Sequence, residues 1–172
     1  MILNTKLDLK FYQRDALVVA PEILGKILCR QVSDKILRTR ITQVEVYKGE
    51  EDSACHARFG KTERSKIMYE SGGLAYIYMI YGIHFLLNVV TGKKNLPQAI
   101  LIRESENFTG PAKLTKALQI DKNLNGESLV KNKIWIEDDG FIIKNYVTAP
   151  RIGIDYATEF YKNINWRFIV PN

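Results

Sequence analysis

A chain of 172 residues has the length of one ordinary domain, and it can bury a core without disulfides or a structural metal. Hydrophobic residues make up 46% and charged residues 26% of the chain, a globular composition that excludes disorder. The 25 Lys and Arg residues outnumber the 19 Asp and Glu residues, and the net charge of +6 favours a polyanionic partner. We therefore expect a single domain over residues 1–172.

The N-terminal segment and the cysteines bear on the compartment. Residues 1–10 have no basic stretch followed by an apolar core, so we expect no secretory signal. Cys29 and Cys55 are then expected to be thiols in a reducing compartment. This predicts a cytoplasmic protein, associated with the nucleoid if bacterial, or a nuclear one if eukaryotic. A zinc site would need nearly every soft ligand, because His56 and His84 are the only histidines, and we expect none.

A helix and a hairpin are predicted first. Asp15 is a suitable N-cap for a helix over residues 16–24, in which Pro21 should introduce a kink or a break. Residues 26–32 and 36–47 are rich in β-branched side chains and are separated by a short polar segment. This pattern predicts a β-hairpin.

A short helix and a basic loop are predicted next. Residues 50–56 fit one short helix. The loop after it carries four cations that only Glu63 opposes, namely Arg58, Lys61, Arg64 and Lys66.

The most apolar stretch, residues 74–90, predicts a second hairpin. It is shorter than the roughly 20 residues that cross a bilayer, and it contains polar side chains, so we expect no association with a membrane. Strands over 74–80 and 83–90 would meet at a tight tip formed by Tyr81 and Gly82.

The remaining segments predict further strands around one more helix. They are a strand over 98–103, a helix from Gly110-Pro111 to about Leu118, a hairpin of 133–137 and 141–144 around Asp138-Asp139-Gly140, and a terminal strand over 166–170. Strands dominate and neighbours can pair antiparallel, so the predicted class is α+β with a largely antiparallel sheet.

Side chains alternate along a strand, and this alternation places residues 41, 43, 45 and 47 on one face. Glu45 and Tyr47 then point the same way, and Val44 and Val46 face the core. Glu45 has two interpretations, a satisfied ion pair at a sheet edge or a catalytic carboxylate, and the pattern alone favours the ion pair.

The same alternation applies to the next strands. It places Tyr76 with Tyr78, His84 with Leu86 and Asn88, and Ala99 with Leu101 and Arg103. Half-buried strand aromatics explain the two tyrosines equally well, and structural hydrogen bonds are the default for Asn88 and Arg103. Tyr81 at an exposed tip contributes nothing to burial, although singly exposed aromatics are normal.

Together these features predict a polar and aromatic cleft, with the basic loop and Tyr81 at its rim. Its members are Glu45, Tyr47, His56, Tyr78, Asn88 and Arg103. Aromatics that stack on bases, beside cations that hold phosphates, are typical of nucleic-acid recognition. Periodicity alone neither shows which strands are neighbours nor names a reaction.

Separated segments resemble, in order, the motifs of the alkyladenine (3-methyladenine) DNA glycosylases. Each of these segments is similar to one family pattern: Val44–His56 to E-A-Y-x-G-x-x-D-x-A-x-H, Tyr76–Gly82 with Asn88 to Y-x-Y-x-x-Y-G…N, Thr109–Leu118 to S-G-P-x-K-L-x-x-A-L, Arg151–Ile154 to R-[IV]-G-[IV], and Trp166–Phe168 to L/W-R-F/W. The resemblance runs from about residue 7 to residue 170, and several motifs in order are far more specific than any one of them.

The resemblance implies a single mixed domain built around a curved antiparallel sheet with flanking helices. It also implies a monofunctional, monomeric enzyme of base excision repair that removes damaged purines from double-stranded DNA. The implied substrates are 3-methyladenine, 7-methylguanine, hypoxanthine and ethenoadenine. No metal, cofactor or covalent lysine intermediate is implied.

The resemblance also implies residue roles. Glu45 matches the carboxylate that activates water, and Arg103 and the carbonyl of Ile152 match the groups that hold this water. Tyr47 and Tyr78 match the aromatics that sandwich the extruded base.

Further matches concern the edge of the base and the DNA. His56 would contact the base edge or sugar, and Asn88 would discriminate against the exocyclic amine of guanine. Tyr81 matches the wedge that fills the hole in the stack. The groups expected on the DNA backbone are Arg58, Lys61, Arg64, Lys66 and Gly82.

The chain departs from the family pattern in ways that bear on DNA grip and lesion range. Only six residues separate Arg103 from Gly110, residues 62–66 lack the usual proline, and His84 replaces an aromatic. Two other functions compete with the glycosylase. A non-catalytic module that grips flipped or single-stranded bases would gain nothing from Glu45, and an enzyme of free nucleosides would not need the exposed Tyr81.

Overall fold

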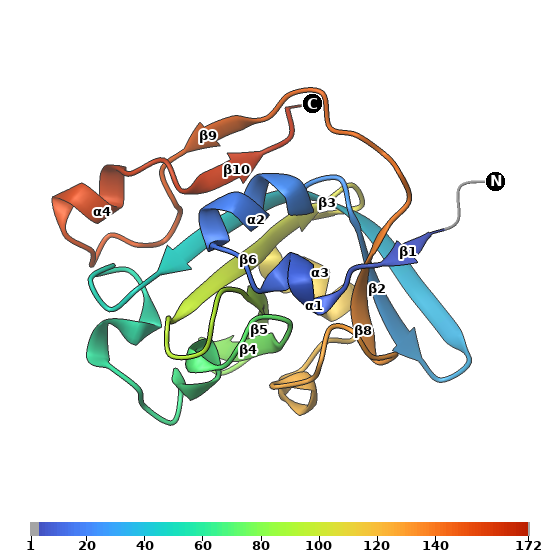
Figure 1. Cartoon of the computed structure of the whole chain (residues 1–172), viewed down its shortest axis with the longest axis horizontal. Coiled ribbons are helices and arrows are strands. Elements are labelled where there is room, and N and C mark those ends of the chain that lie inside the picture. Colours follow the sequence, from blue (N-terminus) through green and yellow to red (C-terminus); the bar gives the residue numbers. More distant parts are fainter. Residues whose placement is uncertain (1–3, 172) are drawn as a thin grey trace.

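Antiparallel strands form the frame of the protein (Figure 1). The computed structural model describes residues 4–171. The main path of the sheet runs β1 (Thr5–Lys6), β8 (Ile134–Asp138), β2 (Ile27–Val32), β3 (Lys35–Lys48), β6 (Gln98–Ser105), β5 (His84–Val90) and β4 (Ala75–Ile80). Off this path, β7 (Phe108–Thr109) pairs with β6, and β10 (Arg167–Ile169) pairs with β3 and with β9 (Val147–Ala149). These pairings confirm the α+β class and both early hairpins.

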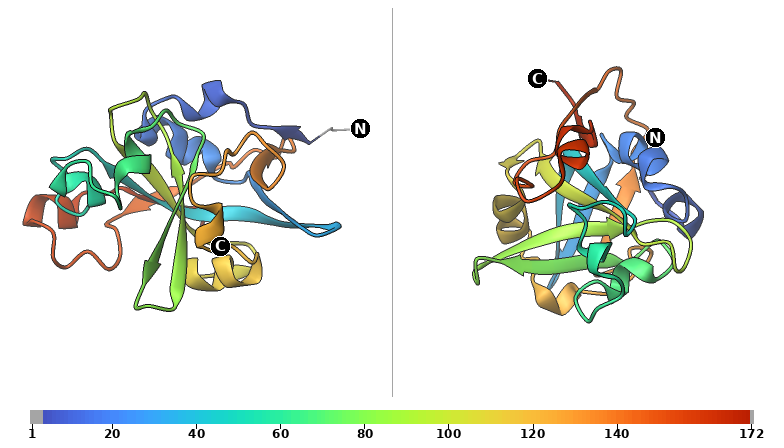
Figure 2. Two further views of the ribbon diagram at one scale, coloured as in Figure 1. Left: turned by 90° about the horizontal axis from the view of Figure 1, so that it is seen from below. Right: turned by 90° about the vertical axis from the view of Figure 1, so that its left-hand side faces the viewer.

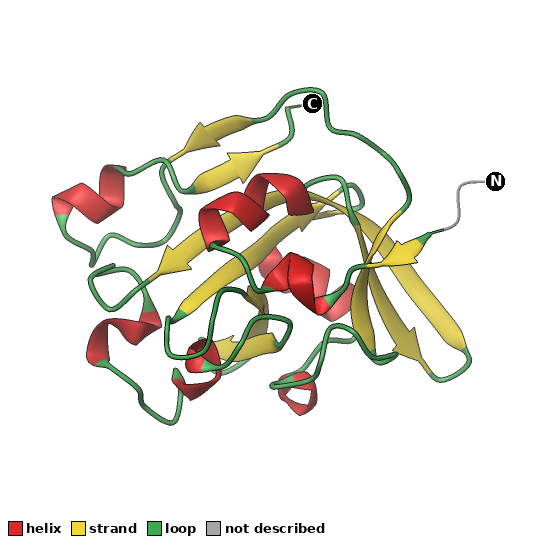
Figure 3. Ribbon diagram, viewed as in Figure 1, coloured by secondary structure: helices red, strands yellow, loops and turns green. Residues whose placement is uncertain are grey.

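The helices are short and lie around the strands (Figure 3). They are α1 (Leu9–Tyr12), α2 (Ala16–Ile23), α3 (Pro111–Ala117) and α4 (Glu159–Asn163), with 3-10 turns at His56–Phe59, Lys66–Tyr69 and Lys122–Leu124. Asp15 caps α2 by accepting a hydrogen bond from the amide of Leu17, and proline occupies the first turn of α3, as predicted. No helix within residues 4–171 has the length and apolar character needed to cross a bilayer.

Strand β3 pairs with three other strands and so connects the two halves of the sheet. It is 14 residues long, and it pairs with β2 through its first half and with β6 and β10 through its second half. Val44 and Val46 face the main core, which α2 and α3 help to close. The opposite face of the second half of β3 is therefore left to carry polar groups.

The β-strand alternation failed at Ile41. A β-bulge shifts the register between β3 and β6 on both sides of Gln43. Because a bulge inserts one residue into the alternation, Ile41 lies in the main core with Val44 and not on the face of Glu45. Beyond the bulge the predicted alternation holds, since Val44 and Val46 are core residues.

The predicted helix over 16–24 forms as α2, which continues through Pro21 to Ile23 without a break and buries its apolar face in the core. The second predicted helix was wrong. Residues 50–55 form bends and turns and no helix, and His56 begins the 3-10 turn His56–Phe59. The carboxylate of Asp52 accepts hydrogen bonds from the amides of Lys48 and Ala54, and these local bonds compete with a helix.

The late hairpin was also wrong in its second strand. Strand β8 forms, but it already has β2 on one side and β1 on the other, so residues 141–144 have no free edge to join. Asp139 instead binds the guanidinium of Arg40 and accepts from the amide of Phe141, which turns the chain away from the sheet. The sequence analysis did not predict β1, α1, β7, β9, α4 or the 3-10 turns.

Candidate active site

A pocket of about 310 Å³ opens on the polar face of the sheet. Strands β3, β4, β5 and β6, the turn that begins at His56 and the loop after Arg151 all contribute to its walls. Most of the predicted site residues line it, namely Tyr47, His56, Arg64, Tyr78, Tyr81, Asn88, Arg103 and Ile152, and Tyr76 and Tyr156 join them. The structure thus brings together residues from distant parts of the sequence in one pocket.

Glu45 lies directly behind the pocket wall and has no exposed surface. Its Oε2 accepts a hydrogen bond of 2.8 Å from the hydroxyl of Tyr47, and its Oε1 accepts one of 2.8 Å from the amide of Ile152. The guanidinium of Arg103 lies 3.3 Å from the same Oε1. All three partners line the pocket, so the carboxylate is one side chain removed from the cavity.

The hydrogen bonds of Glu45 are charge-assisted ones, which hold a carboxylate in a fixed place. Burial, followed by the negative charge of Glu45, raises the pKa of Tyr47 well above its ordinary value. Tyr47 therefore keeps its proton, and its hydroxyl donates a hydrogen bond to Glu45. The ion pair that strand alternation favoured for Glu45 is present, with Arg103, but it lies in a pocket wall and not at a sheet edge.

Three aromatic residues of the pocket contact one another. His56 meets the ring of Tyr78 edge-on, with centroids 4.6 Å apart, and its Nδ1 lies 2.8 Å from the hydroxyl of Tyr76. Burial, together with the charges of Arg64 and Arg58, lowers the pKa of His56 to about 4. At neutral pH His56 is therefore uncharged and offers hydrogen bonds without acting as a ready acid.

Asn88 and Arg103 sit on neighbouring strands below these aromatics. The amide of Asn88 is buried and donates to the carbonyl of Tyr76, 3.2 Å away, so part of its role is structural. The Nε of Arg103 is buried without a hydrogen-bond partner among the described residues. A buried donor without a partner is expensive, and such donors are common at sites that bind something.

Sequence reasoning gave no role to the buried pair of Arg151 and Asp52. The guanidinium of Arg151 binds the Asp52 carboxylate at 2.6 and 2.9 Å, and neither side chain is exposed. Arg151 also donates to the carbonyls of Val46 and Tyr161, and it lies 4.7 Å from the ring centre of Tyr47. It thereby fixes the loop that supplies the Ile152 amide. The resemblance of residues 151–154 to a family pattern was the only signal in the sequence.

Tyr156 was missed as well. Its ring lines the pocket, and its hydroxyl donates to the carbonyl of Ala54. It follows Arg151 in an irregular segment, where periodicity makes no prediction.

Comparison with known proteins identifies the family. The sequence model of the family described as Methylpurine-DNA glycosylase (MPG) matches residues 10–109 and 104–172. A relative from Desulfitobacterium hafniense is 38% identical over 97% of this chain and 96% of its own, and one from Borrelia garinii is 42% identical over 96% of each. A third, from Psychrobacter cryohalolentis, is 42% identical over 86% of this chain and 84% of its own. All three are named 3-methyladenine DNA glycosylases.

The chain belongs to the methylpurine-DNA glycosylase family. It is therefore an enzyme, an N-glycosyl hydrolase that acts on DNA in the repair of alkylation damage. This result confirms the resemblance found in the sequence and sets aside the non-catalytic binding module and the enzyme of free nucleosides. The roles of the individual residues stay predictions.

The tip of the β4–β5 hairpin of this glycosylase carries the predicted wedge residue, Tyr81. The hairpin (green) extends out of the body of the molecule in both views of Figure 2. Tyr81 is 88% exposed, and Tyr81 and Gly82 have positive φ angles of 51° and 70° in the connection between the paired residues Ile80 and His84. A bulky residue held in this conformation at an exposed tip is costly, which points to a function for Tyr81.

We expect Tyr81→Ala to leave the folding stability of the glycosylase almost unchanged, because an exposed side chain adds little burial. Capture of the flipped state should weaken, since the hole in the duplex loses its filler. Single-turnover excision should fall most for well-paired lesions and least for a lesion in single-stranded DNA. Tyr78→Ala, by contrast, should impair every substrate alike. Unfolding of the Tyr81 variant, or equal losses on both kinds of DNA, would remove the wedge role.

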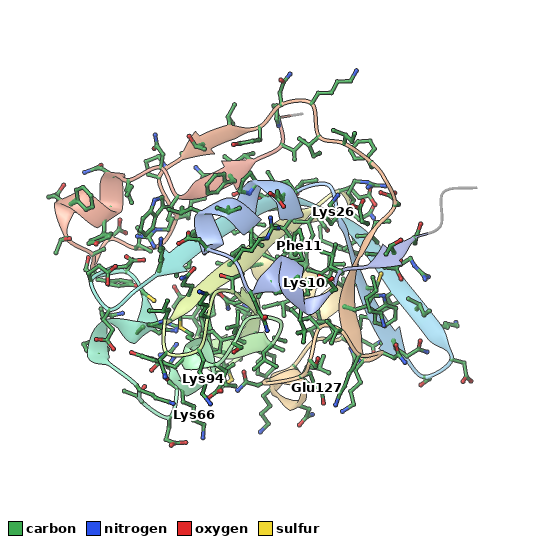
Figure 4. The ribbon with its side chains drawn as sticks, viewed as in Figure 1. Lys10, Phe11, Lys26, Lys66, Lys94 and Glu127 are labelled. Atoms are coloured by element: carbon green, nitrogen blue, oxygen red, sulfur yellow. The ribbon has the colours of Figure 1, made fainter. Side chains whose placement is uncertain are left out.

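The four cations of the basic loop have different surroundings. Lys66 forms an ion pair with Glu63 at 2.7 Å and points away from the body (Figure 4), and Lys61 lies 4.0 Å from Glu70. Arg58 donates to the carbonyl of Cys55 and stacks on two aromatic rings. Arg64 lines the pocket itself. The predicted role on the DNA backbone is thus open to Lys61 and Lys66 after exchange of their carboxylate partners.

Affinity of the glycosylase for DNA should fall as salt rises, with a log–log slope of roughly −0.9 for each phosphate neutralised. We expect the double variant Lys61→Gln, Lys66→Gln to flatten this slope by about one to two units. Lys35→Gln is the matched control, because Lys35 lies exposed at the start of β3 and not at the pocket. Titrations from low to moderate salt measure the slopes. An unchanged slope in the double variant would show that this loop faces away from the DNA backbone.

Proposed function

We propose that this glycosylase flips alkylated or deaminated purines out of double-stranded DNA and hydrolyses the N-glycosidic bond with a water activated by Glu45, leaving an abasic site. The substrate class comprises 3-methyladenine, 7-methylguanine, hypoxanthine and ethenoadenine. The observation that carries the proposal is a fully buried carboxylate held by three residues of an aromatic pocket.

Base flipping explains the shape of the site. A glycosidic bond inside a duplex cannot be reached, and extrusion of a base requires a few kcal/mol, least for damaged or mispaired bases. Tyr81 supplies the filler for the gap, and Tyr47 and Tyr78 supply two ring faces for the extruded purine. His56, with Nδ1 engaged by Tyr76, presents its other nitrogen to the purine edge or sugar.

The chemistry follows from the position of Glu45. Water adds to C1′ as the bond from C1′ to the base nitrogen breaks, and the bonding electrons leave with the base. Positive charge develops on the sugar in this transition state, and an anionic Glu45 stabilises it and accepts the proton of the attacking water. Arg103 and the carbonyl of Ile152 orient that water. The Tyr47 hydroxyl must break its hydrogen bond to Glu45 Oε2 before the water can bind to that oxygen.

The proposal extends to the state of assembly and the location of the enzyme. One chain supplies every group of the pocket, so we infer that the enzyme acts as a monomer. Its substrate places it with the DNA, in the cytoplasm at the nucleoid of a bacterial cell or in the nucleus of a eukaryotic one.

Duplexes that each contain one hypoxanthine, ethenoadenine, 3-methyladenine or 7-methylguanine test the proposal. The purified protein is incubated with each duplex, and alkali then cleaves the strand at abasic sites. We expect scission at the lesion and none in undamaged duplex. Full-length strands for all four lesions would overturn the proposed function.

A further inference from the structure

Arg64 occupies the lesion pocket in addition to its place in the basic loop. Its guanidinium carbon lies 5.2 Å from the ring centre of Tyr78, the residue proposed to stack on the extruded purine. Arg64 lines the same cavity as Asn88 and Arg103. The guanidinium thus sits on the aromatic ring that a flipped base needs, in the position of a cation over an electron-rich face.

The charge of Arg64 is not neutralised by a neighbouring carboxylate. Lys61 and Lys66 of the same loop have acidic partners, Glu70 and Glu63. Within residues 4–171, no carboxylate forms an ion pair with Arg64. After burial, the positive charge of Arg64 is the next cause of the lowered pKa of His56.

The backbone that carries Arg64 is firmly held. Ser65 is fully buried, and its hydroxyl donates to the carbonyl of Gly60 and accepts from the amide of Thr62. The Ser65 amide donates back to the Thr62 hydroxyl. The guanidinium can therefore leave the ring of Tyr78 by side-chain rotation, but its charge stays at the mouth of the pocket.

We propose that Arg64 determines the charge preference of the lesion pocket, by disfavouring purines that carry a positive charge relative to neutral ones. The proposal rests on the proposed function. Any base must displace the guanidinium from Tyr78, so this displacement does not discriminate between lesions. The charge that remains at the rim repels cationic 7-methylguanine and leaves neutral hypoxanthine unaffected.

The test compares single-turnover excision of 7-methylguanine and hypoxanthine from duplexes of identical sequence, with enzyme in excess. The measured quantity is the ratio of the two rates, in which a general loss of DNA affinity cancels. We expect Arg64→Gln to raise the ratio of 7-methylguanine to hypoxanthine about threefold to tenfold, in the range of a partly solvated cation–π or charge contact. Arg64→Lys keeps the charge and should keep the ratio of the wild type.

Lys66→Gln is the matched control, because it removes one charge from the same loop outside the pocket. Its ratio should stay within about twofold of the wild type, because Lys66 lies outside the pocket and any loss of DNA affinity cancels in the ratio. An unchanged ratio in Arg64→Gln, or an equal rise in Lys66→Gln, would overturn the assignment to Arg64. A wild-type enzyme that releases neither base would instead contradict the proposed function.

Discussion

Glu45→Gln is expected to slow single-turnover base excision by about a hundredfold to ten-thousandfold, the range for loss of a general base. Gln has nearly the same shape, and its carbonyl can still accept from the Ile152 amide while its NH₂ meets the hydroxyl of Tyr47. It can neither accept a proton from water nor offer negative charge to the sugar. Lesion-containing duplex should therefore still bind with an affinity close to that of the wild type.

Glu104→Gln is the control for Glu45→Gln. Glu104 follows Arg103 on β6 and lies outside the pocket, so its loss removes a carboxylate from the same region without touching the site. Its excision rate should equal that of the wild type. Similar rates for Glu45→Gln and the wild type would show that another group activates the water.

Asp52→Asn is expected to lower the free energy of unfolding by about 3–5 kcal/mol, because it leaves the buried charge of Arg151 without its partner. Burial would lower the pKa of Arg151, but the hydrogen bond and charge of Asp52 outweigh it and keep the pKa raised. Arg151 is thus cationic in the folded protein, and urea unfolding of the variant measures the loss.

Two further variants show whether the loss in Asp52→Asn comes from the pair. The double variant Asp52→Leu, Arg151→Leu should be less destabilised than the sum of its single variants, because no unpaired charge remains. Glu63→Gln breaks an exposed pair with Lys66 and should leave the unfolding transition unchanged. Additive losses in the double variant would mean that Asp52 and Arg151 contribute independently.

Local patterns predicted the strands that build the pocket. Alternation placed Tyr76 with Tyr78, and Ala99 with Leu101 and Arg103, and these residues do line one cavity. Each of these strands is regular and has one buried apolar face, which fixes the alternation. The same reasoning failed at Ile41, because nothing in a single sequence marks the bulge at Gln43.

Local sequence patterns could not predict the contacts that complete the site. Glu45 and Ile152 are 107 residues apart, and their hydrogen bond depends on how an irregular loop crosses the sheet. Only the resemblance to a family connected the two segments. The ion pair of Asp52 with Arg151 spans 99 residues and illustrates the same limit. The strand predicted over residues 141–144 was wrong for a related reason, because β1, from the other end of the chain, pairs with the edge of β8.

A crystal structure of the Glu45→Gln variant bound to a duplex with one hypoxanthine tests the central claim most directly. We expect the purine to lie between Tyr47 and Tyr78, with C1′ facing residue 45 and with Tyr81 inserted into the gap in the stack. A hypoxanthine that stays paired within the duplex, or that binds outside the pocket next to Glu45, would contradict the proposed mechanism.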